Sequence, residues 1–426
     1  MKQSPAIWRR RFANNLFFVP LLALLLLFGF IVQPRKGAAE TGAASFIDPT
    51  AAIQCGPPNN DCKFGASVYI APFATIKAGA RSATGAADFI TIGNDSNVQD
   101  NTLIDASAGN QPISIGEKVI IAHGATVLGG AKIGTTGTCP PGVPNPCPSF
   151  VGFNAEIAQD AVVEKYAMVS PLARVGRGVT IRSTRKVLPG KNVTTQAEAD
   201  GNEKTVLMVP ADLKFMNEVI HVNVALAHGY AAMAARDASS VRGINYNPKT
   251  DLNPTPRLPT IAGRQQAIPD NPNRVIGDAR SANPLRSNKR NSAFAFSQAR
   301  MLSMRADEGT PFMIGLIGTL DSRVTFHALE HCKLMLGSGN YGRSSIMHGG
   351  TSFNKITSTG NNFSLGENAV FFNSKAGANA VVGTMSLVEG CDLTAAREMR
   401  VVPPFTVRAC APDNTYRDYP VEWRRP

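Results

Sequence analysis

The side chains that could do chemistry in this chain of 426 residues are few, and most lie in its second half. The run Arg305-Ala306-Asp307-Glu308 precedes His327 by 22 residues, and Glu330 follows shortly after. His348 lies 21 residues beyond His327, whereas His123 belongs to the first half. Imidazole nitrogens are common zinc ligands, and carboxylates can transfer protons. These residue types suit metal-assisted proton chemistry, and the elements that carry them decide which of them can meet.

Aliphatic residues recur at every sixth position through the first half of the chain. The recurring residues are Ile92, Val98 and Ile104, then Ile115, Ile121, Val127 and Ile133, then Val151, Ile157, Val163, Val169, Val175 and Ile181. A period of six fits neither an amphipathic helix nor a hairpin, but it is typical of a parallel β-helix with three short strands per coil. Glycine often follows the aliphatic residue, where a tight corner needs positive φ. The sequence therefore predicts a mainly β fold, with a β-helix of hexapeptide repeats over residues 65–185.

The segment after these repeats predicts an α-helix and then a linker. Pro210-Ala211-Asp212 opens a stretch rich in Ala, Val, Leu and Met that continues to Ala235. We expect a helix with an acidic residue near its start, packed back along the β-helix. Residues 238–299 are rich in Pro, Asn, Arg and Ser, which predicts a basic linker.

The net charge of +12 is concentrated in connecting segments. Residues 1–36 carry +6 and residues 236–300 carry +7, which leaves the remainder at about −1. The sequence contains no helix-turn-helix, zinc finger or aromatic stacking platform, so we expect no nucleic-acid partner.

The N-terminal segment, residues 1–36, predicts export of the rest of the chain. Residues 16–32 are an unbroken apolar run of 17 residues, preceded by three arginines. The run is slightly long for a signal peptide and barely long enough to span a membrane. The pair Arg35-Lys36 favours a retained anchor over cleavage near Ala43-Ala44. We expect a membrane-anchored protein with its bulk in the periplasm or an equivalent lumen.

Seven cysteines fit an exported chain. Cys55 and Cys62 lie close together in sequence, as do Cys139 and Cys147. Both pairs could be local disulfides, and the alternative is that they are unpaired buried thiols. Cys332, Cys391 and Cys410 leave at least one odd thiol, and no C-x-x-C pair suggests structural zinc.

Three blocks of the first half resemble γ-class carbonic anhydrases. They are Asn97-Val98-Gln99-Asp100, the pair Ala122-His123, and the tail from Val222 to Tyr230. The resemblance covers roughly residues 45–235. It implies a left-handed parallel β-helix with a flanking C-terminal α-helix, assembly as a trimer, and a zinc ion that three histidines hold between subunits. It also implies CO2 and bicarbonate as the substrate and product.

The second half resembles another copy of the same domain. Arg305-Ala306-Asp307-Glu308-Gly309 and His327-Ala328-Leu329-Glu330 match two blocks of the family. The predicted organisation is an N-terminal anchor segment (1–36), a first domain (45–237), the linker (238–299) and a second domain (300–426).

The resemblance also assigns roles to the residues named at the outset. It implies that His327, His348 and His123 are metal ligands. Arg305 and Asp307 would orient the site across an interface, and Glu308 and Glu330 would assist proton transfer.

Other positions depart from the family pattern. The family's third ligand falls on Leu128 in the first copy and near Phe353 in the second, and its first ligand falls on Asp105 in the first copy. The sequence therefore predicts an incomplete histidine triad, in which His327 pairs with either His123 or His348 and zinc binding is weak or absent. We expect no other cofactor.

Two functions follow from this interpretation. The first is a membrane-anchored protein similar to carbonic anhydrases, with CO2 hydration reduced or lost and a homo-oligomer or pseudo-trimer as the assembly. The second is a non-catalytic scaffold subunit of a larger membrane complex. A hexapeptide acyltransferase is a third reading, disfavoured because an exported compartment lacks acyl-CoA.

Overall fold

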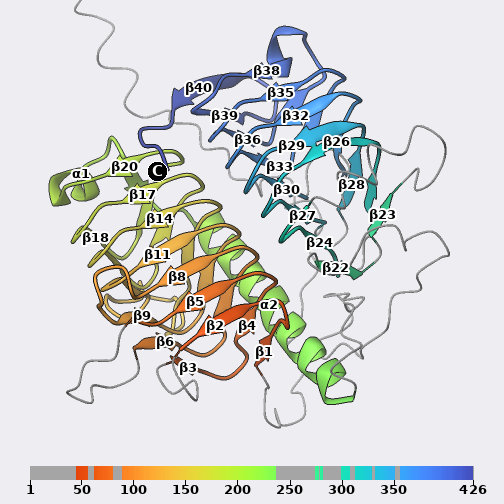
Figure 1. The fold of residues 1–426 in the computed structure, drawn as a ribbon. Coiled ribbons are helices and arrows are strands. Elements are labelled where there is room, and N and C mark those ends of the chain that lie inside the picture. The colour runs from red at the N-terminus through yellow and green to blue at the C-terminus, as the bar shows by residue number, and fades with distance from the viewer. Residues whose placement is uncertain are drawn as a thin grey trace, which may run out of the picture.

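The chain folds into two left-handed parallel β-helices that lie side by side (Figure 1). The computed structural model describes residues 45–55, 62–79, 89–236, 274–277, 279–281, 299–307, 312–328, 332–350 and 356–425. Each β-helix has three sheets, and successive strands of one sheet are three apart in chain order except at the ends of some sheets. The predicted mainly β fold and its two copies are thus confirmed.

The first β-helix contains sheets of eight, seven and six strands. The eight-stranded sheet consists of β1 (Phe46–Ile47), β4 (Tyr69–Ile70), β7 (Asn97–Val98), β10 (Val119–Ile121), β13 (Ser149–Val151), β16 (Met168–Val169), β19 (Arg185–Val187) and the antiparallel β21 (Thr205–Leu207). The second sheet consists of β2 (Ala52–Gln54), β5 (Thr75–Lys77), β8 (Leu103–Asp105), β11 (Thr126–Leu128), β14 (Glu156–Ile157), β17 (Arg174–Val175) and β20 (Asn192–Val193). The third consists of β3 (Cys62–Phe64), β6 (Ile90–Ile92), β9 (Ile113–Ile115), β12 (Lys132–Ile133), β15 (Val162–Val163) and β18 (Thr180–Ile181).

The second β-helix contains sheets of eight, six and five strands. The eight-stranded sheet consists of β22 (Arg274–Gly277), β24 (Ser303–Ala306), β27 (Thr325–His327), β30 (Ile346–His348), β33 (Val370–Phe372), β36 (Leu387–Glu389), β39 (Thr406–Cys410) and the antiparallel β40 (Tyr416–Pro420). The six-stranded sheet consists of β23 (Ala279–Ser281), β25 (Phe312–Ile314), β28 (Lys333–Leu336), β31 (Ile356–Thr359), β34 (Lys375–Ala376) and β37 (Asp392–Leu393). The five-stranded sheet consists of β26 (Ile317–Leu320), β29 (Gly339–Tyr341), β32 (Phe363–Leu365), β35 (Val381–Val382) and β38 (Val401–Val402). A short 3-10 helix, η4 (Glu398–Arg400), precedes β38.

The six-residue repeat builds the core of the first β-helix. Each aliphatic residue of the repeat points inward and is almost wholly buried, and equivalent residues of successive coils stack, as Val98, Ile121 and Val151 do. Alternate residues of each strand point outward, because successive side chains of a β-strand face opposite sides. The predicted solenoid is therefore confirmed, and its outward residues remain available for contacts with the second β-helix.

Helix α2 (Pro210–Arg236) confirms the predicted helix after the coils. Its first turn contains Asp212, which accepts a hydrogen bond from the backbone N of Val209 at 2.9 Å, as expected at a helix start. The helix runs along the first β-helix beside β1, β4, β7 and β10 (Figure 1). A shorter helix, α1 (Gln196–Asp200), lies beside the last coils.

Part of the predicted linker belongs to the second β-helix. Residues 274–277 and 279–281, which the composition placed in the linker, form β22 and β23 and pair in parallel with β24 and β25. The sequence predicted that the second copy begins at residue 300. β22 and β23 add strands of a further coil before that point. Short strands in a polar segment lack the aliphatic repeat that marks a coil in sequence, so only their pairing reveals them.

The two β-helices share a buried junction. Ile120, Phe153 and Leu172 of the first pack in one apolar cluster with Ile346 and Leu387 of the second. Hydrogen bonds cross beside this cluster: Asn101 donates to Thr325 at 3.0 Å, and Asn154 donates to the backbone carbonyl of Asn368 at 3.0 Å. The junction therefore combines apolar burial with hydrogen bonds that cross from one β-helix to the other.

Three disulfides lie in the described part of the chain. Cys55–Cys62 and Cys139–Cys147 confirm the local pairs, whereas Cys391–Cys410 joins two residues that the sequence left unassigned. Cys332 is buried and is not one of the disulfide cysteines, and its sulfur accepts a hydrogen bond from the backbone N of Gly350 at 3.0 Å.

The predicted anchor, residues 16–32, lies outside the described residues. Among the helices that the structure describes, none is both long enough and apolar enough to cross a membrane.

Candidate metal centre

One edge of the second β-helix presents a row of polar side chains toward the first. Arg305, His327 and His348 occupy the same register on the consecutive strands β24, β27 and β30. The residue before each of them, such as Phe326 or Met347, is buried in the core. Alternation along the strand therefore turns the arginine and both histidines toward the junction.

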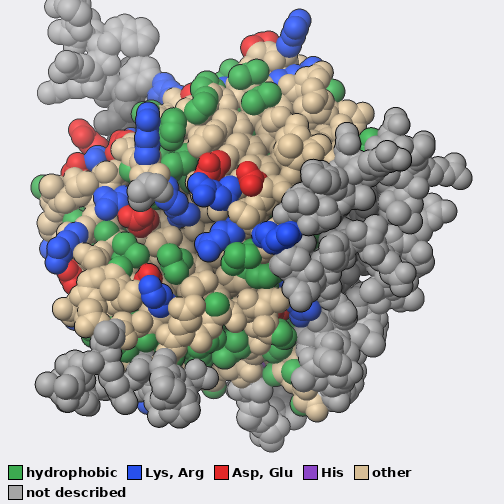
Figure 2. Space-filling view, in the orientation of Figure 1, with side chains coloured by type: hydrophobic (Ala, Val, Ile, Leu, Met, Phe, Trp, Pro, Cys, Tyr) green, Lys and Arg blue, Asp and Glu red, His purple; other side chains and the backbone are tan. Residues whose placement is uncertain are grey.

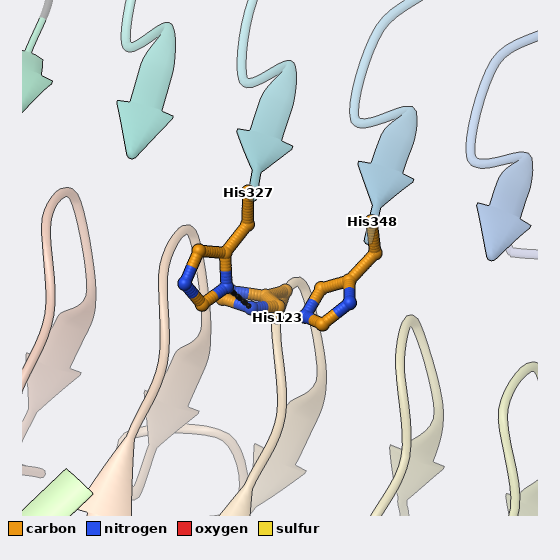
Figure 3. A group of neighbouring side chains, drawn as sticks. All are labelled: His123, His327 and His348. Carbon is orange, nitrogen blue, oxygen red and sulfur yellow. Dashed lines mark hydrogen bonds between the residues drawn. The ribbon is translucent and has the colours of Figure 1, made fainter. Parts of the chain in front are cut away.

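The first β-helix meets this row with residues from its corners. Asp100 and His123 lie two positions after Val98 and Ile121, which are paired in β7 and β10. They are thus equivalent residues of consecutive coils. Figure 3 shows His123 reaching from a corner of the first β-helix toward His327 and His348, which stand at the ends of two strands of the second.

The three imidazoles converge on one point. His123 Nε2 lies 3.1 Å from His327 Nδ1, and one ligand atom from each of the three histidines lies within 4.8 Å of the others. His123, His327 and His348 are 0%, 4% and 6% exposed as whole residues. On the face shown in Figure 2, no histidine side chain reaches the surface. The group is therefore almost wholly buried in the junction.

A buried charge network supports the histidines. Arg305 Nη1 lies 2.9 Å from Asp100 Oδ2, which belongs to the other β-helix, and Arg305 Nη2 lies 3.0 Å from Asp307 Oδ2. Tyr230 of α2 donates a hydrogen bond to Asp307 Oδ2 at 2.6 Å, and Ser303 donates to Asp100 Oδ1. The arginine thus connects both β-helices and, through Asp307, the helix α2. Buried ions persist only when they are paired and hydrogen-bonded in this way.

Asp100 also determines the orientation of His123. His123 Nδ1 lies 3.0 Å from Asp100 Oδ2 and 3.2 Å from the Asp100 backbone N. We place the proton on Nδ1, so that it donates to the carboxylate, because a charge-assisted hydrogen bond is the stronger of the two. Burial by itself would raise the pKa of Asp100, but Arg305 and His123 hold that pKa well below its usual range. The carboxylate is therefore ionised, and Nε2 of His123 keeps its lone pair.

Two of the imidazoles are held neutral. Burial lowers the pKa of His123 to about 4, although the Asp100 carboxylate opposes the shift. Burial and the two neighbouring histidines lower the pKa of His348 well below its usual range. His348 Nδ1 faces the carbonyl of Gly349 at 2.9 Å, which leaves Nε2 for the site. A metal ion binds the neutral imidazole, so His123 and His348 have the protonation state that metal binding requires.

The donor set fits a zinc ion. Two nitrogens bound to one tetrahedral zinc lie about 3.3 Å apart, close to the 3.1 Å between His123 Nε2 and His327 Nδ1. Each Nδ1–H of His123 and His348 has an acceptor behind it, as metal-ligating histidines usually do. Asp307 Oδ1 is buried, lies 3.9 Å from Nε2 of His327 and forms no hydrogen bond. Three imidazoles leave a fourth zinc position open.

The structure differs from the sequence prediction in one essential point. The sequence predicted at most two imidazoles at one site, but His123, His327 and His348 all meet. The sequence weighed His123 and His348 as alternatives, whereas the junction places both beside His327. The expected incomplete triad is therefore corrected: three histidines are present, although none stands at the family's third-ligand position.

The other predicted residues have separate outcomes. Arg305 and Asp307 lie in the site, as expected. Glu308 and Glu330 lie outside the described residues. Asp105 is not part of the histidine group: it lies on β8, in the seven-stranded sheet, and pairs with Lys77 at 3.6 Å. Asp100 was missed as a site residue. The sequence feature that could have identified Asp100 is its position in the block Asn97-Val98-Gln99-Asp100, which carried the family resemblance.

Comparisons with known proteins bear on the family that this chain resembles. No family model matches the chain. A carbonic anhydrase from Methanosarcina thermophila is 29% identical over 219 residues, which are 46% of this chain and 77% of that protein. The resemblance to carbonic anhydrases of the γ class is confirmed.

Solved structures with a similar fold include two bacterial transferases. A hexapeptide transferase family protein from Anaplasma phagocytophilum is 21% identical with a TM-score of 0.30, and it aligns with 43% of this chain and 91% of its own. The UDP-N-acetylglucosamine acyltransferase of Francisella novicida is 10% identical with a TM-score of 0.16, and it aligns with 88% of this chain and 70% of its own. Similarity at this level carries no statement about activity.

Proposed function

We propose that this protein is a zinc-dependent carbonic anhydrase whose metal site lies between the two β-helices of one chain. The observation that carries the proposal is the convergence of His123, His327 and His348, with ligand atoms within 4.8 Å of one another. The similarity to a known carbonic anhydrase supports the same reaction. The proposal replaces the expectation of reduced or lost activity, which depended on a site with two imidazoles.

The residues of the junction supply binding, orientation and shielding. His123, His327 and His348 would hold the zinc ion, which as a Lewis acid lowers the pKa of a bound water to about 7. Asp100 fixes the ring of His123, and the unsatisfied Oδ1 of Asp307 offers a buried acceptor for a proton or for a water.

Aromatic rings bound the same site. The centroid of the Phe153 ring lies 4.9 Å from that of the His348 ring, the centroid of the Phe372 ring lies 5.3 Å from it, and the two phenylalanine rings are 5.6 Å apart. Such walls suit a small apolar substrate such as CO2, and they exclude water that would compete for the site.

We further propose that the protein acts outside the cytoplasm, anchored through residues 16–32. Three disulfides in the described chain support an oxidising compartment, because disulfides are rare where thiols are kept reduced. Fractionation of cells, with alkaline extraction of the membranes, tests the anchor. Recovery of the intact chain in the soluble cytoplasmic fraction would contradict it.

Metal content and the rate of CO2 hydration test the enzyme directly. We expect about one zinc per chain in the wild type, and loss of both zinc and hydration in the His327→Ala and His348→Ala variants. His221→Ala is the matched control, because His221 is exposed on α2 and outside the site. A folded wild type without bound metal or hydration, recovered in a membrane complex, would refute the enzyme and favour the scaffold.

A further inference from the structure

Residues 421–425, here called the strap, leave the second β-helix and lie on the first. They follow β40, the antiparallel strand that ends the eight-stranded sheet. The backbone N of Glu422 donates to the carbonyl of Gly190 at 2.8 Å, and Trp423 Nε1 donates to the carbonyl of Leu172 at 2.5 Å. Val421 and Trp423 are buried in the apolar cluster of the junction.

The strap has charged contacts as well. Glu422 lies 2.6 Å from Lys191 and 3.3 Å from Lys204, both on the first β-helix. Figure 2 shows Lys and Arg side chains along this junction. The strap therefore contacts the first β-helix through buried apolar side chains, through the ion pairs of Glu422 and through hydrogen bonds to main-chain carbonyls. Together these contacts fix its position.

Arg425, the last described residue of the strap, binds the corner of the first β-helix that carries His123. Arg425 Nη2 donates to the carbonyl of Gly124 and to the carbonyl of Asn154, each at 3.2 Å. Gly124 directly follows His123, and the backbone N of Asn154 donates to the carbonyl of His123 at 3.0 Å. One guanidinium thus binds both the residue that follows His123 in the chain and the residue whose backbone N donates to the His123 carbonyl.

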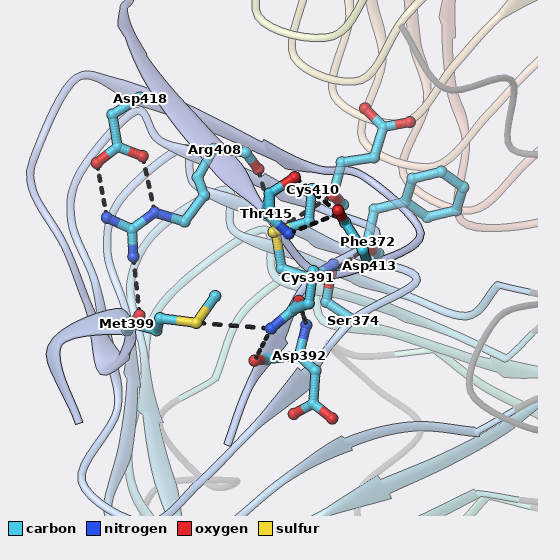
Figure 4. The surroundings of a disulfide bond; sticks show 12 residues. Phe372, Ser374, Cys391, Asp392, Met399, Arg408, Cys410, Asp413, Thr415 and Asp418 are labelled. Carbon is cyan, nitrogen blue, oxygen red and sulfur yellow. Dashed lines mark hydrogen bonds and ion pairs between the residues drawn. A yellow bond between two sulfur atoms is a disulfide. The ribbon is translucent and has the colours of Figure 1, made fainter. Parts of the chain in front are cut away.

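The base of the strap is itself braced within the second β-helix. Arg408 of β39 forms two hydrogen bonds to Asp418 of β40, at 2.7 and 2.6 Å (Figure 4). The Cys391–Cys410 disulfide joins the end of β39 to the preceding coil. The strap is therefore a short extension of a braced hairpin. The corner that it binds is held in place relative to His327 and His348.

We infer that the strap is a positioning element of the metal centre, with Arg425 as the residue that sets the His123 corner against the other β-helix. The inference rests on the proposed zinc site. His327 and His348 belong to one β-helix and His123 to the other. The affinity for Zn²⁺ therefore depends on how closely the junction holds His123 in place. Preorganisation of a ligand raises affinity without any new contact to the ion.

Arg425 variants of the full chain test this inference through metal affinity. In competition with a chelator, we expect Arg425→Ala to weaken Zn²⁺ binding about tenfold, the scale of one or two lost hydrogen bonds. Arg425→Lys, which keeps a donor for the carbonyls, should recover much of the loss. Arg424→Ala is the control, because Arg424 is exposed and lies over the Phe405 ring at 4.3 Å. In the Co²⁺-loaded protein, the visible spectrum should change for Arg425→Ala and stay unchanged for Arg424→Ala.

Hydrogen exchange of the metal-free chain separates this inference from the proposed function. We expect faster exchange over residues 119–128 in Arg425→Ala than in the wild type or in Arg424→Ala. Unchanged exchange and unchanged Zn²⁺ affinity in Arg425→Ala would overturn the inference while the zinc site stands. A wild type that binds no metal would refute the proposed function, and the exchange experiment would then decide alone whether the strap holds the corner.

Discussion

At the scale of residues, the site depends on one carboxylate that serves two partners. Asp100 accepts from His123 Nδ1 and pairs with Arg305 across the junction. If the carboxylate is removed, the charge of Arg305 stays buried without this partner and without water. The loss of stability is then larger than the contribution of the pair itself. Asp100 therefore couples the orientation of a metal ligand to the cohesion of the two β-helices.

We expect Asp100→Asn to lower the free energy of unfolding by about 3 kcal/mol and metal affinity by about 10–100-fold. The amide would leave Arg305 with Asp307 alone. Urea unfolding and chelator competition measure the two effects. Asp105→Asn is the control. Asp105 pairs with the exposed Lys77 and accepts hydrogen bonds from the backbone N and the hydroxyl of Ser107, which an amide oxygen can still accept, so this variant should cost about 0.5 kcal/mol or less. Equal effects of the two variants would show that Asp100 has no special place in the junction.

The metal-free protein should lose stability as the pH falls from about 6.5 toward 4. The pKa of His123 is about 4 in the folded chain, against roughly 6.5 in an unfolded chain. Between these values only the unfolded state takes up the proton, so stability is complete above pH 6.5 and declines below it. Between pH 7 and 4.5 the loss from His123 is about 2–3 kcal/mol. Urea unfolding of the wild type and of His123→Gln measures it, and an identical pH dependence in both would contradict the prediction.

At the scale of elements, strands that carry little sequence signal complete the second β-helix. β39 and β40 form its terminal antiparallel pair, and Cys391–Cys410 ties β39 to the coil before it. This disulfide closes a loop with a sequence separation of 19, whereas Cys139–Cys147 closes one of 8. A longer closed loop removes more conformational entropy from the unfolded chain.

We therefore expect the Cys391→Ser/Cys410→Ser double variant to lose roughly 3 kcal/mol of stability. The Cys139→Ser/Cys147→Ser variant is the comparison and should lose somewhat less, because its loop is shorter. Urea unfolding under non-reducing conditions measures both. A smaller loss at Cys391–Cys410 than at Cys139–Cys147 would argue against a stabilising role at the end of the second β-helix.

At the scale of the whole molecule, the chain contains both sides of its own interface. His123 precedes His327 by more than 200 residues, yet their nitrogens lie 3.1 Å apart. The family resemblance implied a site between subunits, whereas this site is completed within one chain. Covalent connection gives the two halves a high effective concentration for each other.

Zinc binding should therefore be independent of protein concentration. We expect about one Zn²⁺ per chain, with the same affinity at nanomolar and at micromolar protein, because dilution cannot separate the ligands. Chelator competition at both concentrations, with light scattering to record the assembly state, measures this. Affinity that falls together with dissociation of an oligomer would show that a second chain completes the site.

Much of the fold could be predicted from the sequence, because its signals are local. A six-residue period places aliphatic residues inward, and the run from Pro210 to Arg236 has the composition and the starting residue of a helix. The likeness of two blocks to one family likewise indicated the duplication and the residues Arg305, Asp307 and His327. β22 and β23 were missed, since their segment lacks the repeat.

The metal centre was decided by tertiary structure alone. Sequence periodicity determines which face of a β-helix each residue occupies, and the family resemblance named His123, His327 and His348 as candidate ligands. It does not determine how two β-helices lie against each other, because that depends on the packing of side chains far apart in the chain, such as Phe153 against Phe372. That packing brings three imidazoles together where the sequence predicted two.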